Sequence, residues 1–281
     1  MKKDLIAVPG VFLANSSYLR DFFKLHEVPV YLETAVDSIT EEGVIIKRKD
    51  GSKEVIQGDD VIMFAISEDM STTANVMRLA AEELDYEEHV YVIDSANLST
   101  GIGHLVVEAA IMARKQMSAK DIVSSIEALK PYVRASFVVD TLTYLHRGGR
   151  CSSTAALVGS LLKLKPRIVV KNGKMEADKK YRGNLKKVIL QYVKDLEKEL
   201  IHAKKDRVFI THSGCEPEIV DSVRQYLEGL KYFRSVIETT AGSVISSHCG
   251  PGTLGVLFIA GGDSFGPYDK QFDFNNNGVM E

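Results

Sequence analysis

From about residue 60 onward, short apolar runs alternate with segments whose apolar residues recur every three or four positions. The short runs predict strands at 61–66, 89–94, 135–139 and 208–211, followed by a last apolar segment at 254–259. The periodic segments predict helices at 72–84, 103–115, 118–129, 155–164 and 216–230. This alternation is typical of α/β units, so we expect an α/β fold.

Local signals define some elements more closely. Ser118 and Asp121 have capping-box spacing at the start of the helix predicted at 118–129. Asn172-Gly173 separates strands predicted at 167–170 and 174–177, which indicates a tight β-hairpin. Downstream, apolar residues at helical spacing predict one face of a long amphipathic helix: Leu185, Val188, Ile189, Tyr192, Val193, Leu196 and Leu200.

The two ends differ from the middle of the chain. Residues 28–62 alternate and turn like a β-meander. The segment after Ala260 is rich in Gly, Asp and Asn, which predicts an extended or disordered polar tail. Asp273, Asn275, Asn277 and Gly278 match the first half of an EF-hand loop, but the sequence stops before the bidentate ligand, so we expect no metal site.

Length and composition narrow the class of protein. The 281 residues, 45% apolar and 26% charged, suffice for two globular domains. A net charge of −3 without a Lys/Arg tract argues against nucleic acid as a partner. No apolar run has the length of a membrane span and the N-terminal one is too short for a signal peptide, so we expect a cytoplasmic protein without stable membrane insertion. Three widely spaced cysteines indicate neither a disulfide framework nor a zinc site.

Two glycine-rich runs carry the most distinctive chemistry. Residues 146–150 read HRGGR, and residues 246–255 read SSHCGPGTLG. Glycines let backbone N–H groups approach a ligand closely, while Arg and His side chains can bind a carboxylate or a phosphate. The two runs therefore predict an anion-binding site.

Several motifs occur together in the order found in one known family. They are ISEDMSTT (66–73), AAEEL (80–84), VIDS (92–95), FVVDTLTYLHRGGR (137–150), GSLLKLKP (159–166), YRG (181–183) and the run around His248. With these motifs, residues 58–260 resemble the DegV family of bacterial fatty-acid-binding proteins.

The resemblance implies a two-domain α/β fold, with a mainly parallel sheet in an N-terminal domain (1–140) and an α/β lipid-binding domain (141–262). The polar tail predicted from composition then covers residues 263–281. It implies that a long-chain fatty acid fills an apolar tunnel with its carboxylate at the domain junction. A separate fatty acid kinase would then convert the bound acid to an acyl phosphate. The protein itself would be a carrier, without catalytic residues or a cofactor.

The resemblance also implies roles for single residues. Ser71, expected at the start of a helix after a strand, and His248, expected in a Gly/Ser-rich turn, would bind the carboxylate. Arg150 is a further cation for which a plain surface role stays open. Four other residues are implied near the head group, a phosphate or the partner: Thr72, Arg147, Arg182 and Gly250.

The first 57 residues depart from the family pattern. The usual opening strand that ends in Asp-Ser and the Thr-Ser-x-Pro-Ser motif are not visible, and the usual Ser-Gly-Thr is Ser71-Thr72-Thr73. Residues 28–62 instead look like the strand-rich end of an NAD-binding subdomain of flavin-dependent oxidoreductases, without the G-x-G-x-x-G turn. The N-terminal segment is therefore either diverged or composite.

Other functions stay open at this point. A phosphotransfer enzyme or subunit is one alternative, because DegV folds resemble dihydroxyacetone-kinase-type domains; the lack of a Walker-type motif and of clustered magnesium ligands argues against it. A flavin or nucleotide protein rests on residues 28–62 alone. A Ser-His or Cys-His hydrolase is disfavoured, since no G-x-S-x-G elbow is present.

Overall fold

The computed structural model describes residues 4–7, 34–40, 43–48, 50–56, 60–149 and 164–261. The chain divides into two units, Met1–Lys130 and Pro131–Glu281. No helix within the described ranges is long and apolar enough to cross a membrane.

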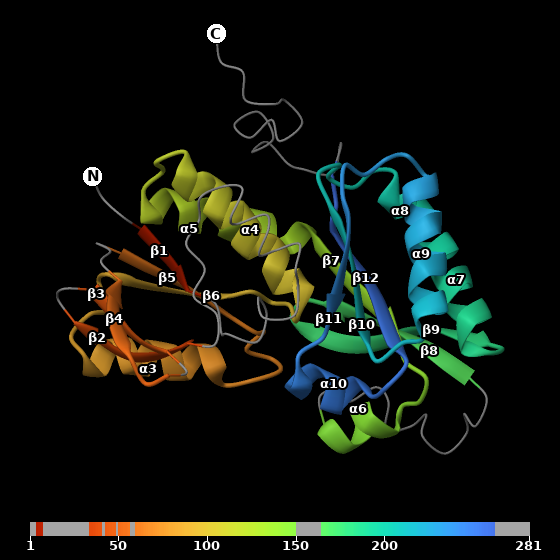
Figure 1. Cartoon of the computed structure of the whole chain (residues 1–281), viewed down its shortest axis with the longest axis horizontal. Coiled ribbons are helices and arrows are strands. Elements are labelled where there is room, and N and C mark those ends of the chain that lie inside the picture. The colour runs from red at the N-terminus through yellow and green to blue at the C-terminus, as the bar shows by residue number, and fades with distance from the viewer. Residues whose placement is uncertain are drawn as a thin grey trace, which may run out of the picture. The chain divides into compact units, whose positions relative to one another are not determined.

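The first unit is built on a parallel sheet. Its strands β1 (Asp4–Ala7), β5 (Asp60–Ala65) and β6 (Val90–Asp94) lie in the order β1-β5-β6. Helix α3 (Thr73–Glu83) lies on one face of this sheet, while α4 (Thr100–Arg114) and α5 (Ala119–Leu129) lie on the other (Figure 1). The central strand β5 is apolar at nearly every position because helices cover the sheet on both sides.

The helices of this unit follow from their sequences. The predicted cap of α5 is confirmed, because Ser118 Oγ accepts a hydrogen bond from the Asp121 backbone N–H at 3.2 Å. Helix α4 begins at Thr100, three residues before the predicted start, and nearly all of its residues are buried. A helix that is buried on nearly all sides has no exposed polar face whose periodicity would mark its first turn, so the start of α4 could not be predicted from periodicity.

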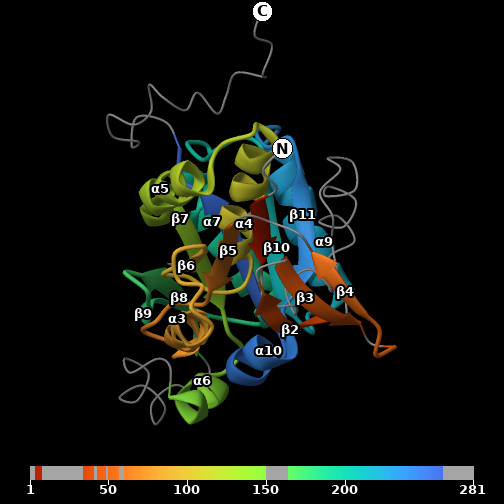
Figure 2. The same cartoon turned by 90° about the vertical axis from the view of Figure 1, so that its left-hand side faces the viewer.

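An antiparallel sheet of three strands also belongs to the first unit (Figure 2). Its strands β2 (Thr34–Thr40), β3 (Gly43–Arg48) and β4 (Lys53–Ile56) follow one another as a meander. The meander predicted for 28–62 is confirmed over these strands. Its last residues are an exception, because 60–62 open β5 of the parallel sheet.

The second unit contains a mixed sheet of six strands in the order β11-β10-β12-β7-β8-β9. Strands β10 and β11 are parallel, and every other neighbouring pair is antiparallel. The bounds are β7 (Val133–Val138), β8 (Leu164–Lys171), β9 (Lys174–Arg182), β10 (Val208–Ser213), β11 (Val236–Thr240) and β12 (Thr253–Ile259).

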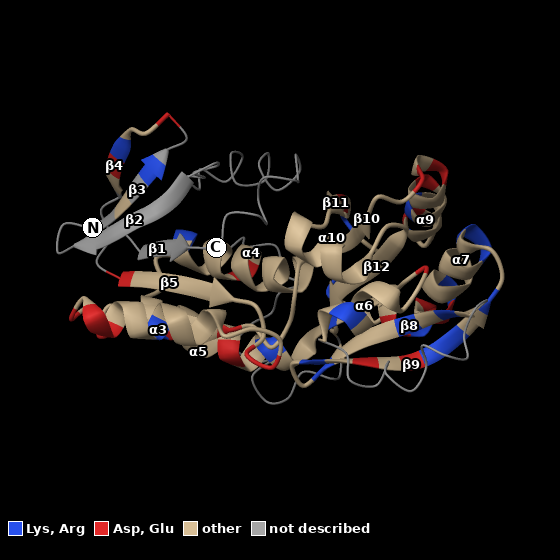
Figure 3. Ribbon diagram, turned by 90° about the horizontal axis from the view of Figure 1, so that it is seen from below, with Lys and Arg blue, Asp and Glu red and all other residues tan. Residues whose placement is uncertain are grey.

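The predicted hairpin joins β8 to β9. Asn172 (φ 49°) and Gly173 (φ 78°) both adopt positive φ, as the tightest hairpin turns require. Among the described strands β9 pairs only with β8, so it forms one edge of the sheet. Lys and Arg residues occur along this hairpin and at the start of the following helix (Figure 3).

Three helices cover one face of the sheet: α7 (Leu185–Asp195), α8 (Glu197–Leu200) and α9 (Pro217–Gly229) (Figure 1). The long helix predicted from 185 to 200 is interrupted at Leu196. The Leu196 N–H bonds to the carbonyls of both Tyr192 and Val193, so the turn tightens before α8 begins. Leu196 and Leu200 stay buried in the same core, which explains why the apolar spacing continues through the break.

Several short elements were not predicted: β1, β11, the 3₁₀ turn at Lys130–Tyr132, α6 (Thr143–Gly148) and α10 (Ser243–Cys249). Helices α6 and α10 pack side by side and carry the two glycine-rich runs (Figure 1). The helix predicted at 155–164 falls almost wholly outside the described residues, and Leu164 itself begins β8. The tail predicted at 263–281 also lies outside them.

Candidate functional site

His248 lies on the last turn of helix α10, so its predicted position in a turn is wrong. Backbone hydrogen bonds run from Ser246 N to Gly242 O and from Gly250 N to Ser246 O, both at 2.8 Å. The serines that favoured a turn are accommodated in the helix, because Ser246 Oγ and Ser247 Oγ donate to backbone carbonyls of Ala241 and Val244. The turn begins only at Gly250, where φ is +81°.

The imidazole of His248 packs against Gly148 at the end of α6. A Cβ at position 148 would overlap the imidazole Nδ1 and lie 3.1 Å from Cε1, closer than carbon atoms pack. The ring of Tyr144 fills the corresponding space beside Gly250, where a Cβ would lie 2.9 Å from the ring Cγ. The glycines therefore let the two helices interlock, and the structure brings together the two runs predicted to form one site.

The turn after α10 fits closely against neighbouring segments. A Cβ at Gly252 would lie 3.6 Å from the Cβ of Asp140 and 2.9 Å from Leu185 Cδ2. Asp140 follows β7 and pairs with Lys165, whose Nζ lies 2.5 Å from Oδ1. Leu185 begins α7, so the residue after β7 and the start of α7 both border this turn.

The candidate arginines of this unit are exposed. Arg147 lies on α6, one residue before Gly148, and Arg182 ends β9, so it follows the hairpin and precedes α7 as predicted. Both guanidinium groups are accessible to an anionic group or a partner. Arg150 lies outside the described residues.

In the first unit, Ser71 lies in the loop between β5 and α3. Its Oγ lies 2.7 Å from Thr73 Oγ1 and accepts a hydrogen bond from the Thr73 N–H at 3.3 Å. Thr72 is the exposed N-cap residue of α3 and makes no side-chain capping bond. Ser71 thus bonds to the start of the helix from one position earlier than the cap.

A neighbouring loop, which sequence reasoning left without a role, supports the Ser71 loop. Asp94 Oδ1, at the end of β6, accepts hydrogen bonds from the N–H groups of Glu68 (3.2 Å) and Ala96 (2.9 Å). Polar residues at the carboxyl ends of parallel strands commonly line ligand sites, and this position could have singled out Asp94. The backbone of Ser99, before α4, is strained at φ 49° and ψ −130°.

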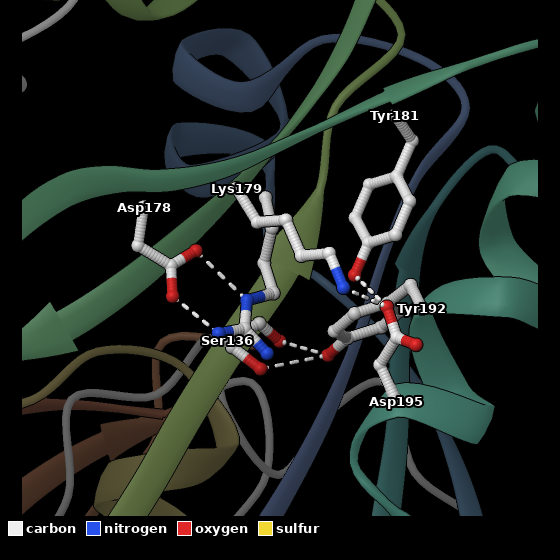
Figure 4. Close-up of polar contacts among 7 residues, drawn as sticks. Ser136, Asp178, Lys179, Tyr181, Tyr192 and Asp195 are labelled. Carbon is white, nitrogen blue, oxygen red and sulfur yellow. Dashed lines mark hydrogen bonds and ion pairs between the residues drawn. The ribbon is translucent and has the colours of Figure 1, made fainter.

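Charged side chains on β8, β9 and α7 form a second polar group (Figure 4). Arg167 Nε donates to Asp178 at 2.8 Å, and this contact raises the pKa of the guanidinium. Burial alone would raise the pKa of Asp195, but hydrogen bonds from Lys179 and Tyr181 outweigh burial and lower this pKa. These charges neutralise one another, so we regard this group as structural.

The thiols described in the structure are poor nucleophiles. Burial raises the pKa of the Cys215 thiol to about 12, and its Sγ lies 3.5 Å from the Thr253 carbonyl. Cys249 is buried beside His248. In the described part of the chain, no group of three His, Cys, Asp or Glu side chains could hold a metal ion.

Comparison with known proteins decides the family. A family model described as an uncharacterised protein of the DegV family matches residues 52–261. The chain belongs to the DegV family. Both glycine-rich runs and the Ser71 loop fall within the DegV match.

DegV relatives cover most of this chain. A DegV domain-containing protein of Clostridium perfringens is 35% identical over 209 residues, which are 73% of this chain and 71% of that protein. A solved structure on fatty acid binding by a DegV family protein of Thermus thermophilus is 31% identical, with a TM-score of 0.66 over 72% of this chain and 71% of that one. The structure of DegV from Bacillus subtilis, described as a fatty acid binding protein, is 22% identical, with a TM-score of 0.69 over 92% of this chain and 100% of that one. The predicted α/β DegV-like fold is confirmed.

Proposed function

We propose that this protein binds a long-chain fatty acid, contacts its carboxylate through Ser71 and His248, and presents it to a partner fatty acid kinase. The observation that carries the proposal is the 31% identity to a DegV protein whose structure concerns fatty acid binding. On this proposal the protein is a carrier, and phosphoryl transfer belongs to the kinase.

The local chemistry at Ser71 and His248 supports their proposed roles. Either hydroxyl of the Ser71–Thr73 pair can donate, so Ser71 can turn its proton toward a carboxylate while it accepts from Thr73. His248 is half-buried, and an imidazole can donate a hydrogen bond to an anion. Arg147, Arg182, Thr72 and the backbone at Gly250 are proposed to contact the head group, its phosphate or the kinase.

Burial of the acyl chain supplies most of the binding free energy on this proposal. About fourteen to sixteen methylenes at ~0.8 kcal/mol each give an upper bound near 12 kcal/mol. One head-group hydrogen bond contributes about 1 kcal/mol, or up to about 3 kcal/mol where the acceptor is charged. The protein should therefore keep its ligand when a single polar contact is lost.

The decisive experiment is organic extraction of the purified protein followed by mass spectrometry. We expect a C14 to C18 fatty acid in the extract. An extract without fatty acid, together with ATP turnover by the protein alone, would reject the carrier in favour of a phosphotransfer enzyme. A yellow protein that releases flavin would reject it in favour of a flavin protein.

Replacement of Ser71 tests the head-group contact. In Ser71→Ala we expect fatty acid still to co-purify, while the dissociation constant for palmitate rises roughly fivefold, as expected for about 1 kcal/mol. Titration of delipidated protein measures the change. Ser125→Ala is the matched control, because the Ser125 hydroxyl bonds only to the Asp121 carbonyl of its own helix. Complete loss of co-purifying lipid from Ser71→Ala would contradict the expectation that the tail contributes more binding free energy than the head group.

The role of the exposed arginines is tested with a bacterial fatty acid kinase and ATP. We expect Arg147→Ala and Arg182→Ala to retain palmitate and to slow its conversion to acyl phosphate. Equal conversion rates for wild type and both variants would reject the contact with the kinase or phosphate.

A further inference from the structure

The hydroxyl of Tyr192 bridges two strands at the centre of the six-stranded sheet. Figure 4 shows its contacts with Ser136 on one of them. Oη donates to the Ser136 carbonyl on β7 at 2.7 Å and accepts from the Val256 N–H on β12 at 3.0 Å. It also lies 2.9 Å from Ser136 Oγ, which can donate to it. Three hydrogen bonds satisfy this hydroxyl fully, although the Tyr192 side chain is completely buried.

The bridge lies at one position of the strand pair. Ser136 and Val256 are directly opposite each other in the antiparallel register of β7 and β12. A side chain from α7 therefore joins main-chain groups of two residues that are opposite each other in the ladder. Tyr192 reaches this position because Val188, Ile189 and Val193 anchor the same face of α7 in the core.

The neighbouring residue, Gly255, is adapted to the same geometry. A Cβ at position 255 would lie only 2.7 Å from the Ser136 carbonyl oxygen, the atom that accepts from Tyr192. A side chain there would push this carbonyl out of place. The glycine and the tyrosine are thus two separate observations that fix the position of one oxygen atom.

The same register leads directly to the candidate site. Leu254 pairs with Val138 near the ends of β12 and β7. If this register continues two residues further, Gly252 lies opposite Asp140. Their proximity agrees with this, because a Cβ at position 252 would lie 3.6 Å from the Cβ of Asp140. Beyond this pair, β7 leads into α6 and α10 leads into β12. The contacts of His248 with Gly148 and of Tyr144 with Gly250 therefore depend on how β7 and β12 are aligned.

We propose that Tyr192 is a positioning residue for the head-group site: its hydroxyl sets the alignment of β7 with β12 and thereby holds the imidazole of His248 in place. This inference rests on the proposed function, in which His248 binds the carboxylate. Tyr192 itself does not contact the ligand. Its hydroxyl acts through the two strands whose ends carry α6 and α10.

The test compares two probes that differ only in the head group, palmitate and 1-hexadecanol, bound to delipidated protein. In Tyr192→Phe we expect the affinity for palmitate to fall roughly tenfold, as expected for a weakened hydrogen bond to a charged group. The affinity for 1-hexadecanol should stay within about twofold, because the tail makes the same contacts in both probes. Hydrogen exchange at the Val256 N–H should become faster.

Two further variants separate positioning from general stability. Tyr181→Phe removes a hydroxyl that bonds Asp195 on α7 and lies outside the Tyr192 bridge, so it should leave the ratio of the two affinities as in the wild type. Gly255→Ala keeps the tyrosine but displaces the carbonyl, so it should change the ratio as Tyr192→Phe does. If Tyr192→Phe does not fold, Gly255→Ala takes its place in the test.

The outcomes are distinct. Equal losses for both probes, or unchanged affinities, in Tyr192→Phe or in Gly255→Ala would overturn the positioning role while leaving fatty acid binding intact. Failure of the wild type to bind palmitate would overturn the proposed function instead.

Discussion

Gly148 shows how one missing methyl group determines the position of a candidate site residue, His248. The space that a Cβ would occupy is taken by the imidazole of His248. Gly148 does not adopt a positive φ, so backbone conformation does not require glycine there. Glycine is required because the imidazole approaches so closely. The sequence showed the glycine pair in HRGGR but could not show that a histidine one hundred residues later packs on the first of the two.

Substitution of this glycine gives a prediction at the residue scale. In Gly148→Ala we expect the imidazole to be displaced, palmitate affinity to fall about tenfold and the free energy of unfolding to drop by about 1–3 kcal/mol, as in other overpacked sites. Isothermal titration and urea unfolding measure the two quantities. Gly229→Ala, at the end of α9 with no atom near the new Cβ, is the matched control and should keep both. Wild-type palmitate affinity in Gly148→Ala would argue against a head-group role for His248.

Other residues of the candidate site differ in how far the sequence could identify them. The resemblance pointed to Ser71 and His248. Around Ser71 the structure has the predicted order, in which a strand is followed by a helix. The roles of Tyr144, Asp140 and Tyr192 were not predicted, because they arise from contacts with segments far away along the chain. No local pattern records such a contact.

At the scale of single elements, periodicity and capping signals predicted most of the longer helices and strands well. The Asn172-Gly173 hairpin and the Ser118 cap are set by local backbone chemistry, so the sequence sufficed for both. The short helices α6 and α10 were missed because glycine and serine disfavour helices, and packing between the two overrides that propensity. The break at Leu196 was missed because the apolar positions continue in phase on both sides of it.

The start of helix α7 provides a prediction at this scale. Asn184 is its N-cap, and Asn184 Oδ1 accepts a hydrogen bond from the Lys187 N–H at 2.9 Å. Asn184→Ala should lower the free energy of unfolding by about 1 kcal/mol, whereas Asn184→Asp should retain it or raise it slightly through the helix dipole. Urea unfolding monitored by circular dichroism measures both. Equal losses in the two variants would show that the cap does not stabilise α7.

For the whole molecule, buried tyrosines predict how stability depends on pH. Burial raises the pKa of Tyr192 from its usual value of 10.0 to about 12, and burial also raises that of Tyr181. Below pH 10 both phenols are protonated in the folded and the unfolded chain, so they add no pH dependence. Between pH 10 and 12 the unfolded chain loses these protons first, so the free energy of unfolding must fall as pH rises.

Tyr192 should account for ~2–3 kcal/mol of this fall. Urea unfolding of wild type and Tyr192→Phe at several pH values from 8 to 11.5 measures it, and we expect a shallower decline in the variant. Comparison of the two proteins cancels the contribution of lysines and of the other tyrosines. Parallel curves would show that the phenol of Tyr192 ionises as easily in the folded protein as in the unfolded chain.

Among the described strands, β9 lies at one border of the six-stranded sheet and pairs with β8 alone. Such a border invites a foreign strand to add itself, which is how many proteins begin to aggregate. Here its outward positions carry Lys174, Glu176, Lys180 and Arg182, and a foreign strand would have to strip water from these ionic groups before it could dock. We therefore expect these charged side chains to oppose edge-to-edge pairing between separate molecules.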